Sequence, residues 1–334
     1  PPHPPEKDGG RPVSNSVVYK APRSISRAQA SRDAPRRRRG NPQARRRALA
    51  GLGFLLPGLV ILLVWVFYPT FYALAISFTD SSGLNTPEFI GLANYERIIS
   101  DPDTRGAVVN TLVYAVAYAP LVIVVAMAMA LLLNRKDLPM RGFIRTVVFV
   151  PFIISMAVAA LAWSFLLDAN TGLVPYWFSQ VFGRSMPDLL NDPTWAMPTV
   201  ILVAVWKNFG YFMVIFIAGL QGIAAELYEA AHLDGANAWR RFWNVTVPGL
   251  RPTMTYVIIL AANGAFQAFD QIYIMTGGGP ERSTETIVYR VYTEGFTNFR
   301  QGYASSLSFV LMAITMVVGI IQLSINRRQE KDLA

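Results

Sequence analysis

Polar side chains occur inside two long apolar segments of the chain, residues 196–220 and 252–275. They are Lys207, Asn208 and Tyr211 in the first segment, and Asn263, Gln267 and Asp270 in the second. Ionisable and amide groups are costly inside a membrane, so their presence there indicates a function. Aromatic faces combined with amide and carboxylate groups can stack on the C–H face of a sugar and bind its hydroxyls. These residue types predict a noncovalent site for a hydroxyl-rich solute.

Helix geometry places these residues at similar heights in the membrane. If the first segment ends near position 222 and the second begins near 252, Lys207 and Gln267 lie ~22 Å along their helices and Asp270 ~27 Å. They can then meet around or just above the middle of the membrane. A structural ion pair between Lys207 and Asp270 is the alternative, because intramembrane charges usually pair with one another. Asn208, Tyr211 and Gln267 are the stronger candidates for lining a path.

No arrangement of residues predicts catalysis or metal binding. The sequence contains no Gly-x-x-x-x-Gly-Lys-Ser/Thr nucleotide-binding loop. Residues 276–280, Thr-Gly-Gly-Gly-Pro, lack the lysine of such a loop and are typical of a tight turn. His3 and His232 are the only histidines and cysteine is absent, so neither a zinc site nor a disulfide is expected. The chain is therefore not predicted to be an enzyme.

The composition predicts an integral membrane protein that could position these residues. Charged residues make up 15% of the chain, whereas soluble domains contain about 25%. Six apolar segments are each long enough to cross a hydrocarbon core of ~30 Å at ~1.5 Å per residue. They lie near residues 51–78, 106–133, 143–167, 196–220, 252–275 and 303–325. Prolines inside these segments (Pro57, Pro120 and Pro151) are tolerated where neighbouring helices satisfy the freed backbone groups.

The basic charge is concentrated at the beginning of the chain. Residues 1–47 contain thirteen Lys/Arg and three Asp/Glu, and their Pro-, Arg- and Ser-rich composition predicts a disordered tail. Lys and Arg also predominate in the loops at 135–145 and 240–251 and after residue 326, so these loops and both termini are predicted to be cytoplasmic. The arginine runs in the tail are better explained by a role in orienting the chain in the membrane and by contact with anionic lipid than by binding of nucleic acid.

The segment between the fourth and fifth spans is less apolar than its flanks. Its first part has helical spacing, and Gly235 follows where a left-handed helix terminator costs least. An amphipathic segment, residues 239–247, comes next, and Pro248 and Pro252 bracket the start of the following helix. The pattern predicts two short helices with a sharp break between them, which form a rigid protrusion from a membrane protein.

These motifs resemble those of a known family. Glu229, Ala230 and Ala231, then Gly235 and the Val-Thr-Val-Pro sequence that ends at Pro248, are similar to the cytoplasmic EAA loop of ATP-binding-cassette (ABC) import permeases. Leu-Gln-Gly-Ile at 220–223 and the Thr-Gly-Gly-Gly-Pro turn are similar to motifs of the permeases in the carbohydrate (maltose-type) subgroup. The resemblance covers residues 48–326. It implies an all-α integral membrane protein with six transmembrane helices and the type I ABC importer transmembrane-domain fold.

The resemblance also implies domain limits and partners. A permease domain at 48–326, with a coupling loop at 222–250, would lie between cytoplasmic tails at 1–47 and 327–334. Such a permease forms a heterodimer with a second homologous permease subunit in the bacterial inner (plasma) membrane, and it works with an ATPase dimer and an extracytoplasmic solute-binding protein. ATP and Mg would bind the ATPase, and no cofactor is expected on this chain.

The family implies roles for the motif residues of the coupling loop. Glu229 and Asp234 would make polar contacts with a groove of the ATPase. Ala230 and Ala231 would permit close approach, and Gly235 would make the turn.

The resemblance identifies the transported solute less precisely than it identifies the fold. The family's sugar-lining positions before the loop correspond to Asn208 and Tyr211, but those on the following helix fall near residues 264–268, where small residues are frequent. A di- or oligosaccharide is predicted, and glycerol phosphate or a glycerophosphodiester is the alternative that Lys207 would suit. A secondary transporter with a Lys207–Asp270 proton or ion relay is a second alternative, although no internal repeat typical of such carriers is visible.

Overall fold

The computed structural model describes residues 42–84, 86–135 and 137–331, without the side chains of residues 42–50, 52 and 325–331. In this part of the chain the regular structure is helical, and the one extended pairing is an isolated antiparallel bridge between Thr79 and Phe89. This confirms the predicted all-α fold. The predicted N-terminal tail lies mainly outside the described residues, although residues 42–47 already belong to the first helix. In the predicted C-terminal tail, residues 327–331 continue the last helix, and residues 332–334 lie outside the described residues.

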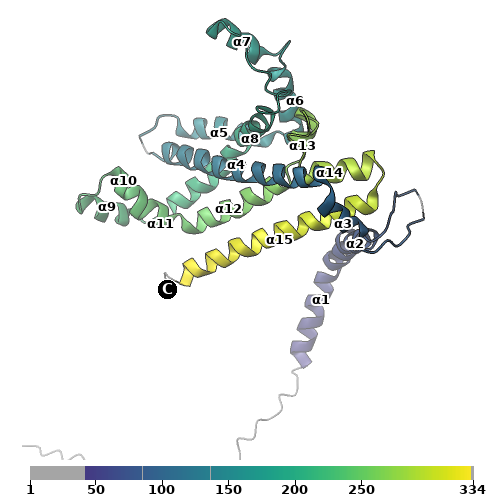
Figure 1. Ribbon diagram of the computed structural model, residues 1–334. Coiled ribbons are helices and arrows are strands. Elements are labelled where there is room, and N and C mark those ends of the chain that lie inside the picture. Colours follow the sequence, from purple (N-terminus) through teal and green to yellow (C-terminus); the bar gives the residue numbers. More distant parts are fainter. Residues whose placement is uncertain (1–41, 85, 136, 332–334) are drawn as a thin grey trace, which may run out of the picture. The chain divides into compact units, whose positions relative to one another are not determined.

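The helices follow one another along the chain as Figure 1 shows. In the first half they are α1 (Pro42–Leu62), the π-helix η1 (Leu63–Phe67), α2 (Tyr68–Ile76), α3 (Ala93–Ser100), α4 (Pro102–Leu133), α5 (Arg141–Ile153), α6 (Met156–Leu167) and α7 (Leu173–Phe182). In the second half they are α8 (Ala196–Gln221), α9 (Ala225–Leu233), α10 (Ala238–Arg241), the π-helix η2 (Phe242–Thr246), α11 (Val247–Gly249), α12 (Arg251–Phe266), α13 (Asp270–Met275), α14 (Ile287–Tyr292), the π-helix η3 (Thr293–Thr297) and α15 (Gln301–Lys331).

Candidate membrane spans lie near the segments that the sequence predicts. Within the described residues four helical stretches are long and apolar enough to cross a membrane: Gly53–Ile76, Pro102–Leu133, Ala196–Gln221 and Gln301–Ser324. Two bent helix pairs bring the number to as many as six if each pair is one span: α5 with α6, and α10–α11 with α12. The six predicted spans are therefore compatible with the fold, but two of them need correction.

The third predicted span, residues 143–167, is not one straight helix. It is divided between α5 and α6, which meet at an angle of 94°. Pro151 removes a backbone donor near the end of α5. Ser155 then caps α6, because its hydroxyl accepts a hydrogen bond of 3.3 Å from the backbone N–H of Val158. A local helix stop and a local helix start thus produce the bend.

The fifth predicted span, residues 252–275, is also interrupted. α12 ends at Phe266, residues 267–269 are irregular, and α13 begins at Asp270. Non-helical backbone at membrane depth is tolerated where it is buried in protein or lines a cavity. The break coincides with the polar residues of this segment, which places it at the candidate site described below.

The described part of the chain divides after Leu63 into two compact units. The first contains α1, with Pro57 inside the helix. In the second, α4 packs along α8 and α12, and α8 also packs against α5 (Figure 1). Small side chains such as Ala126, Ala130 and Ala204 are fully buried in this core, and small residues let helix backbones approach closely in membranes.

Two less apolar segments, residues 222–250 and the segment from α13 to η3, lie at opposite ends of α12. Residues 222–250, which contain α9 to α11, join these helices at one end, and α12 leads to α13 and α14 at its other end (Figure 1). There α15 packs against α14, η3 and α3. The fold thus presents a helical loop at one end, a polar helix cluster at the other, and the interrupted helices between them.

Candidate functional site

The 222–250 loop contains the break that the sequence predicts at Gly235. α9 ends at Leu233, and Gly235 adopts a φ of +76°, which is easy for glycine and strained for most residues. The Ala236 N–H donates to the Ala231 carbonyl at 2.9 Å, and the Gly235 N–H donates to the His232 carbonyl at 3.0 Å. These two bonds form a Schellman motif, which satisfies carbonyls that the end of a helix leaves free. The predicted terminator is confirmed.

Hydrogen bonds fix the second half of the same loop. The Asn237 side chain caps α10 by accepting from the Arg240 N–H at 2.9 Å. The Tyr228 hydroxyl on α9 lies 3.0 Å from the buried Thr246 hydroxyl at the end of η2. Because this contact joins the two arms across the turn, the loop is a braced elbow rather than a flexible connection. Leu250, which is fully buried, leads from the loop into α12.

The predicted motif residues lie on the surface of this elbow. Glu229, Ala230, Asp234 and Gly235 are exposed, whereas Ala231 and Pro248 are half-buried. Large apolar side chains are exposed beside them, including Leu233 at 87% and Trp239 at 68%. Exposed apolar side chains beside polar residues are typical of surfaces that contact another protein or a membrane. The elbow therefore combines a rigid backbone with a surface suited to a protein partner.

A cavity of about 400 Å³ lies at the interrupted helices and brings together most of the predicted solute residues. Its lining includes five of them: Lys207, Asn208, Tyr211, Gln267 and Asp270. Asn263 is not part of the lining, but its side-chain oxygen accepts a 2.6 Å hydrogen bond from Gln267 and so orients that side chain. We call this space the central cavity.

Lys207 points its ammonium group at aromatic and backbone groups rather than at a carboxylate. The residue is buried, with 8% exposure, and its Nζ lies 3.5 Å from the Phe152 carbonyl and 5.0 Å from the centroid of the Phe152 ring. Among the described residues, no ion pair within 4.0 Å joins Lys207 to Asp270. The direct ion pair considered from the sequence is thus not formed in this structure, and both groups line the same cavity.

The two helix breaks build the walls of the central cavity. The bend between α5 and α6 contributes Phe152 and Met156, and the break after α12 contributes Gln267, Ala268 and Phe269. The sequence analysis missed the aromatic and methionine members of this set, because it treated both spans as continuous helices. Pro151, next to Phe152, and the capping residue Ser155 are local signals that could have indicated the first break.

Aromatic rings and side-chain amides both line the central cavity. Phe152 stacks on Tyr211 with ring centroids 4.5 Å apart and an interplanar angle of 13°. From α4, Tyr114 stacks on Tyr118 at 5.5 Å, and the Tyr114 hydroxyl accepts a 2.8 Å hydrogen bond from the Gln271 amide. The predicted type of surface, aromatic faces beside hydrogen-bonding groups, is therefore present. Tyr114, Tyr118 and Gln271 add to the predicted residues.

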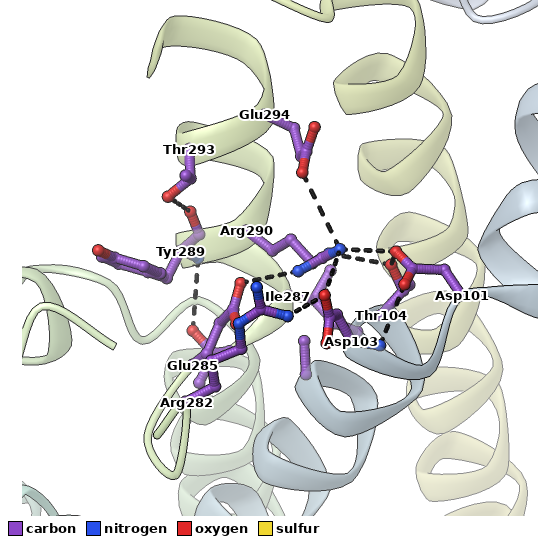
Figure 2. A network of polar contacts seen from close by, with 12 residues as sticks. Asp101, Asp103, Thr104, Arg282, Glu285, Ile287, Tyr289, Arg290, Thr293 and Glu294 are labelled. Carbon is purple, nitrogen blue, oxygen red and sulfur yellow. Dashed lines mark hydrogen bonds and ion pairs between the residues drawn. The ribbon is translucent and has the colours of Figure 1, made fainter. Parts of the chain in front are cut away.

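At the N-terminal end of α4, a buried arginine binds the residues of a second polar cluster (Figure 2). Arg290 on α14 donates hydrogen bonds to Asp101 at 2.6 Å and to Glu285 at 3.1 Å, and its Nε donates to the Thr104 hydroxyl at 2.9 Å. Glu294 lies 3.9 Å away on the following turn. We call these five residues the arginine network. It connects the start of α4 to α14 and η3.

The charged residues of this network lie outside the candidate spans, and their opposite charges stabilise one another. Burial by itself raises the pKa of Asp101, but the Thr104 hydrogen bond and the Arg290 charge outweigh it, so this pKa lies below its usual value. Burial likewise lowers the pKa of Arg290, and the neighbouring Glu285 and Asp101 carboxylates raise it above its usual value. Both groups are therefore charged over the physiological range.

A second cavity, of about 440 Å³, opens beside the arginine network. Its lining includes Gly277, Gly278 and Gly279 of the glycine-rich turn as well as Tyr289. Within that turn the Thr284 hydroxyl donates to the Gly279 carbonyl at 2.8 Å and lies 2.7 Å from the Thr276 hydroxyl. The turn predicted for residues 276–280 is therefore present as a closed, hydrogen-bonded loop. We call this space the outer cavity.

Comparisons with known protein families agree with this arrangement. Residues 122–331 match the family described as "Binding-protein-dependent transport system inner membrane component". The sn-glycerol-3-phosphate transport system permease protein UgpA of Brucella abortus biovar 1 (strain 9-941) is 38% identical over 274 residues, 80% of this chain and 91% of that protein. The lactose transport system permease protein LacF of Rhizobium radiobacter is 30% identical over 285 residues, 83% of this chain and 94% of that protein.

A solved structure shares the fold. A chain of a bacterial alginate ABC transporter, crystallised in complex with an alginate pentasaccharide-bound periplasmic protein, superposes with a TM-score of 0.75 at 21% sequence identity. The match covers 86% of this chain and 96% of that chain. The predicted type I importer fold is thereby confirmed.

Proposed function

Because the chain belongs to the family of binding-protein-dependent transport system inner membrane components, we propose that it is one permease subunit of an ATP-driven importer for a di- or oligosaccharide. The central cavity carries this proposal. It combines stacked aromatic faces with side-chain amides and hydroxyls, which is the surface that a sugar ring needs. Relatives named for lactose and for starch degradation products support a carbohydrate.

One observation favours a second candidate solute within the same family. Several relatives of 36–38% identity are named as sn-glycerol-3-phosphate permeases. Lys207 offers a cationic group to the central cavity without a carboxylate within 4.0 Å. A lysine ammonium is a suitable partner for a phosphate. Import of glycerol phosphate or a glycerophosphodiester is therefore the alternative, and it depends on Lys207.

The elbow at 222–250 is the proposed contact with a separate ATPase dimer, which would bind ATP and Mg. Its exposed motif residues, Glu229 and Asp234, would make polar contacts there, while Ala230 and Ala231 would allow close approach. Because Tyr228 and Thr246 brace the two arms, movement of the elbow would be transmitted to α8 and α12 rather than absorbed. In this mechanism ATP-driven closure of the ATPases tilts these helices and exposes the central cavity alternately to the two sides of the membrane.

The remaining subunits and the orientation complete the proposal. A second homologous permease would close the pore, and an extracytoplasmic binding protein would deliver solute to the end that carries the arginine network. The Lys/Arg bias of the loops supports placing the elbow and both termini in the cytoplasm of a bacterial cell, with the chain in the plasma membrane. No cofactor would be bound by this chain itself.

Uptake into reconstituted vesicles tests the proposal. The complex of both permeases and the ATPase would be placed in liposomes with its binding protein outside, and accumulation of radiolabelled maltose, lactose and sn-glycerol 3-phosphate would be measured. We expect accumulation of a sugar that requires ATP and is unaffected by an ionophore. A variant of the ATPase without its nucleotide-binding lysine is the control. Uptake driven by an ion gradient without ATP would contradict an ABC importer.

A further inference from the structure

Five aromatic rings form a continuous series that begins just before α13 and continues through α13 and α14 to η3. We call them the aromatic ladder: Phe269, Tyr273, Tyr289, Tyr292 and Phe296. Phe269 stacks on Tyr273 with centroids 5.4 Å apart, and both rings contact Tyr292 at 5.2 Å. Tyr292 in turn stacks on Phe296 at 5.5 Å. Tyr289 lies 6.3 Å from Tyr273 and 6.5 Å from Phe269. Each ring therefore has at least one aromatic neighbour within the ladder.

The ladder connects the two cavities. Phe269 lines the central cavity, whereas Tyr289 lines the outer cavity beside the arginine network. The rings are not sealed in the core, because Tyr273 is 46% exposed and Phe296 is 69% exposed. A core cluster would hide such faces. Phe269 and Tyr289, with ring centroids 6.5 Å apart, thus link the two cavities, and the half-exposed Tyr273 ring contacts both of them.

The glycine-rich turn helps to hold the ladder in place. Gly278 has a φ of +79°, and a Cβ atom added there would lie 2.7 Å from Cε1 of Tyr289. A side chain at this position would therefore push the Tyr289 ring out of its place. The arginine network fixes the same helix one residue further on, at Arg290. Two independent features of the fold thus position Tyr289 at the edge of the outer cavity.

We propose that the aromatic ladder is a stacking track that conducts pyranose rings between the outer cavity and the central cavity. Aromatic faces bind the C–H face of a sugar weakly and with little directional demand, so a solute can pass from ring to ring without being trapped. Three tyrosine hydroxyls along the ladder, at Tyr273, Tyr289 and Tyr292, supply hydrogen bonds to sugar hydroxyls. The inference rests on the proposed import function and deepens it, since it requires a solute that contains a sugar ring.

Substitutions at the two most exposed rings test the ladder with the least risk to folding. Tyr273→Ala, Phe296→Ala and the double variant would be reconstituted with the partner subunits and binding protein. For the sugar that the wild type accumulates from maltose and lactose, the ratio of solute transported to ATP hydrolysed would be measured. We expect this ratio to fall about threefold in each single variant and more in the double variant, because ATPase stimulation by the loaded binding protein does not involve the ladder.

Conservative variants and a matched control separate stacking from structure. Tyr273→Phe and Phe296→Tyr keep a ring and should restore at least half of the wild-type ratio. Phe182→Ala on α7 removes a ring of similar exposure, 61%, that lies outside the ladder, and it should leave the ratio unchanged. Size-exclusion chromatography of each complex shows whether the second permease is retained.

Each other outcome overturns the proposal in a recognisable way. A wild-type ratio in the double alanine variant means that the rings do not guide solute. Loss of the second permease from the alanine variants means that the ladder is a subunit interface. Uptake of sn-glycerol 3-phosphate but of neither sugar would contradict the ladder, because that solute has no sugar ring, although the proposal of an ABC importer would stand. Failure of the wild type to accumulate any of the three probes with ATP is instead a failure of the proposed function, and the ladder fails with it.

Discussion

Arg290 donates a hydrogen bond of 2.6 Å to a carboxylate oxygen of Asp101, although 189 positions separate the two residues in the chain. The Thr104 hydroxyl completes a triangle, because it accepts from Arg290 at 2.9 Å and donates to Asp101 at 2.8 Å. Asp101 also caps α4 through the Asp103 N–H. One arginine therefore locks the start of α4 to α14, at the edge of the outer cavity (Figure 2).

Removal of the Arg290 charge should destabilise this end of the molecule. Arg290→Met leaves the buried carboxylate of Glu285 and the half-buried carboxylate of Asp101 without their cation, and breaking a buried ion pair costs about 3 kcal/mol. We expect the apparent Tm of the purified complex to fall by about 5–10 °C. Arg300→Met is the matched control: Arg300 is half-exposed and pairs with Glu294 at 3.4 Å, so its loss should cost less than about 1 kcal/mol. Equal effects of the two substitutions would contradict a special role of Arg290.

The arginine network should lose stability in acid in a defined window. Asp101 has a folded-state pKa below its ordinary value of 3.8, so its contribution is complete above that value and is lost as the pH falls through the depressed pKa. The apparent Tm of the wild type should therefore decline more steeply below pH 4 than that of Asp101→Asn, which cannot titrate there. Parallel Tm–pH curves for the two proteins below pH 4 would show that Asp101 does not contribute.

The turn at Gly235 should be required for coupling rather than for insertion. Gly235→Val forces a β-branched residue into a φ of +76°, at a cost of about 1–3 kcal/mol. No atom lies within 4 Å of the position that a Cβ would take, so the effect would come from the backbone and not from a clash. We expect lost stimulation of ATP hydrolysis by the loaded binding protein, with normal yield of the membrane-inserted protein.

An asparagine at the same position is the matched control, because asparagine tolerates the left-handed conformation better than valine. Gly235→Asn should retain most of the stimulated hydrolysis. Glu229→Ala should act in the same direction as the valine variant but more mildly, since it removes one exposed polar group. Normal stimulation together with lost uptake in Gly235→Val would place the defect in the pore instead of the elbow.

Side chains of the central cavity should affect transport without affecting assembly. Tyr211→Ala removes the ring that stacks on Phe152, and Gln267→Ala removes an amide that Asn263 orients. Each should reduce the initial uptake rate about tenfold, which is about 1.4 kcal/mol of lost interaction. Leu202→Ala, at an exposed position of α8, is the control and should transport normally. Wild-type uptake by both cavity variants would show that the cavity is not on the solute path.

Substitution of Lys207 should distinguish the two candidate solutes. Lys207→Met keeps the apolar stem and most of the length of the side chain but removes the charge that lines the central cavity. If the solute is a neutral sugar, we expect uptake to change less than threefold. If it is a glycerol phosphate, loss of the charge-assisted contact should reduce uptake at least about tenfold. Lys207→Arg, which keeps the charge, should preserve phosphate uptake better than Lys207→Met.

The amino-acid sequence by itself determined the class of protein, the number and approximate limits of the apolar segments and the position of the elbow. These features depend on local physics. A run of about 20 apolar residues is sufficient to indicate a membrane span, and Gly235 marks its turn because few other residues tolerate a positive φ. For the same reason the closed turn at 276–280 could be predicted. The family resemblance rested on these same short motifs.

Only the tertiary structure decided how the predicted residues meet. Lys207 and Asp270 could be assigned to similar heights, but their partners could not, and the fold gives Lys207 the Phe152 carbonyl and ring instead of the carboxylate. That arrangement depends on the 94° bend between α5 and α6, which positions Phe152. How strongly a proline bends a membrane helix depends on whether neighbouring helices supply hydrogen-bond partners for the backbone groups that it leaves free. A hydropathy profile contains no information about which helices are neighbours in the fold.

The arginine network and the aromatic ladder show the same limit. Arg290 appears in the sequence as one charge in a mixed loop, and its partners Asp101 and Thr104 belong to another helix far away in the chain. Whether a charge is solvated or buried against opposite charges follows from three-dimensional packing, because the energy of a charge depends on the groups around it and not on its neighbours in sequence. Local composition fixes which helices form, and long-range contacts decide which side chains share a site.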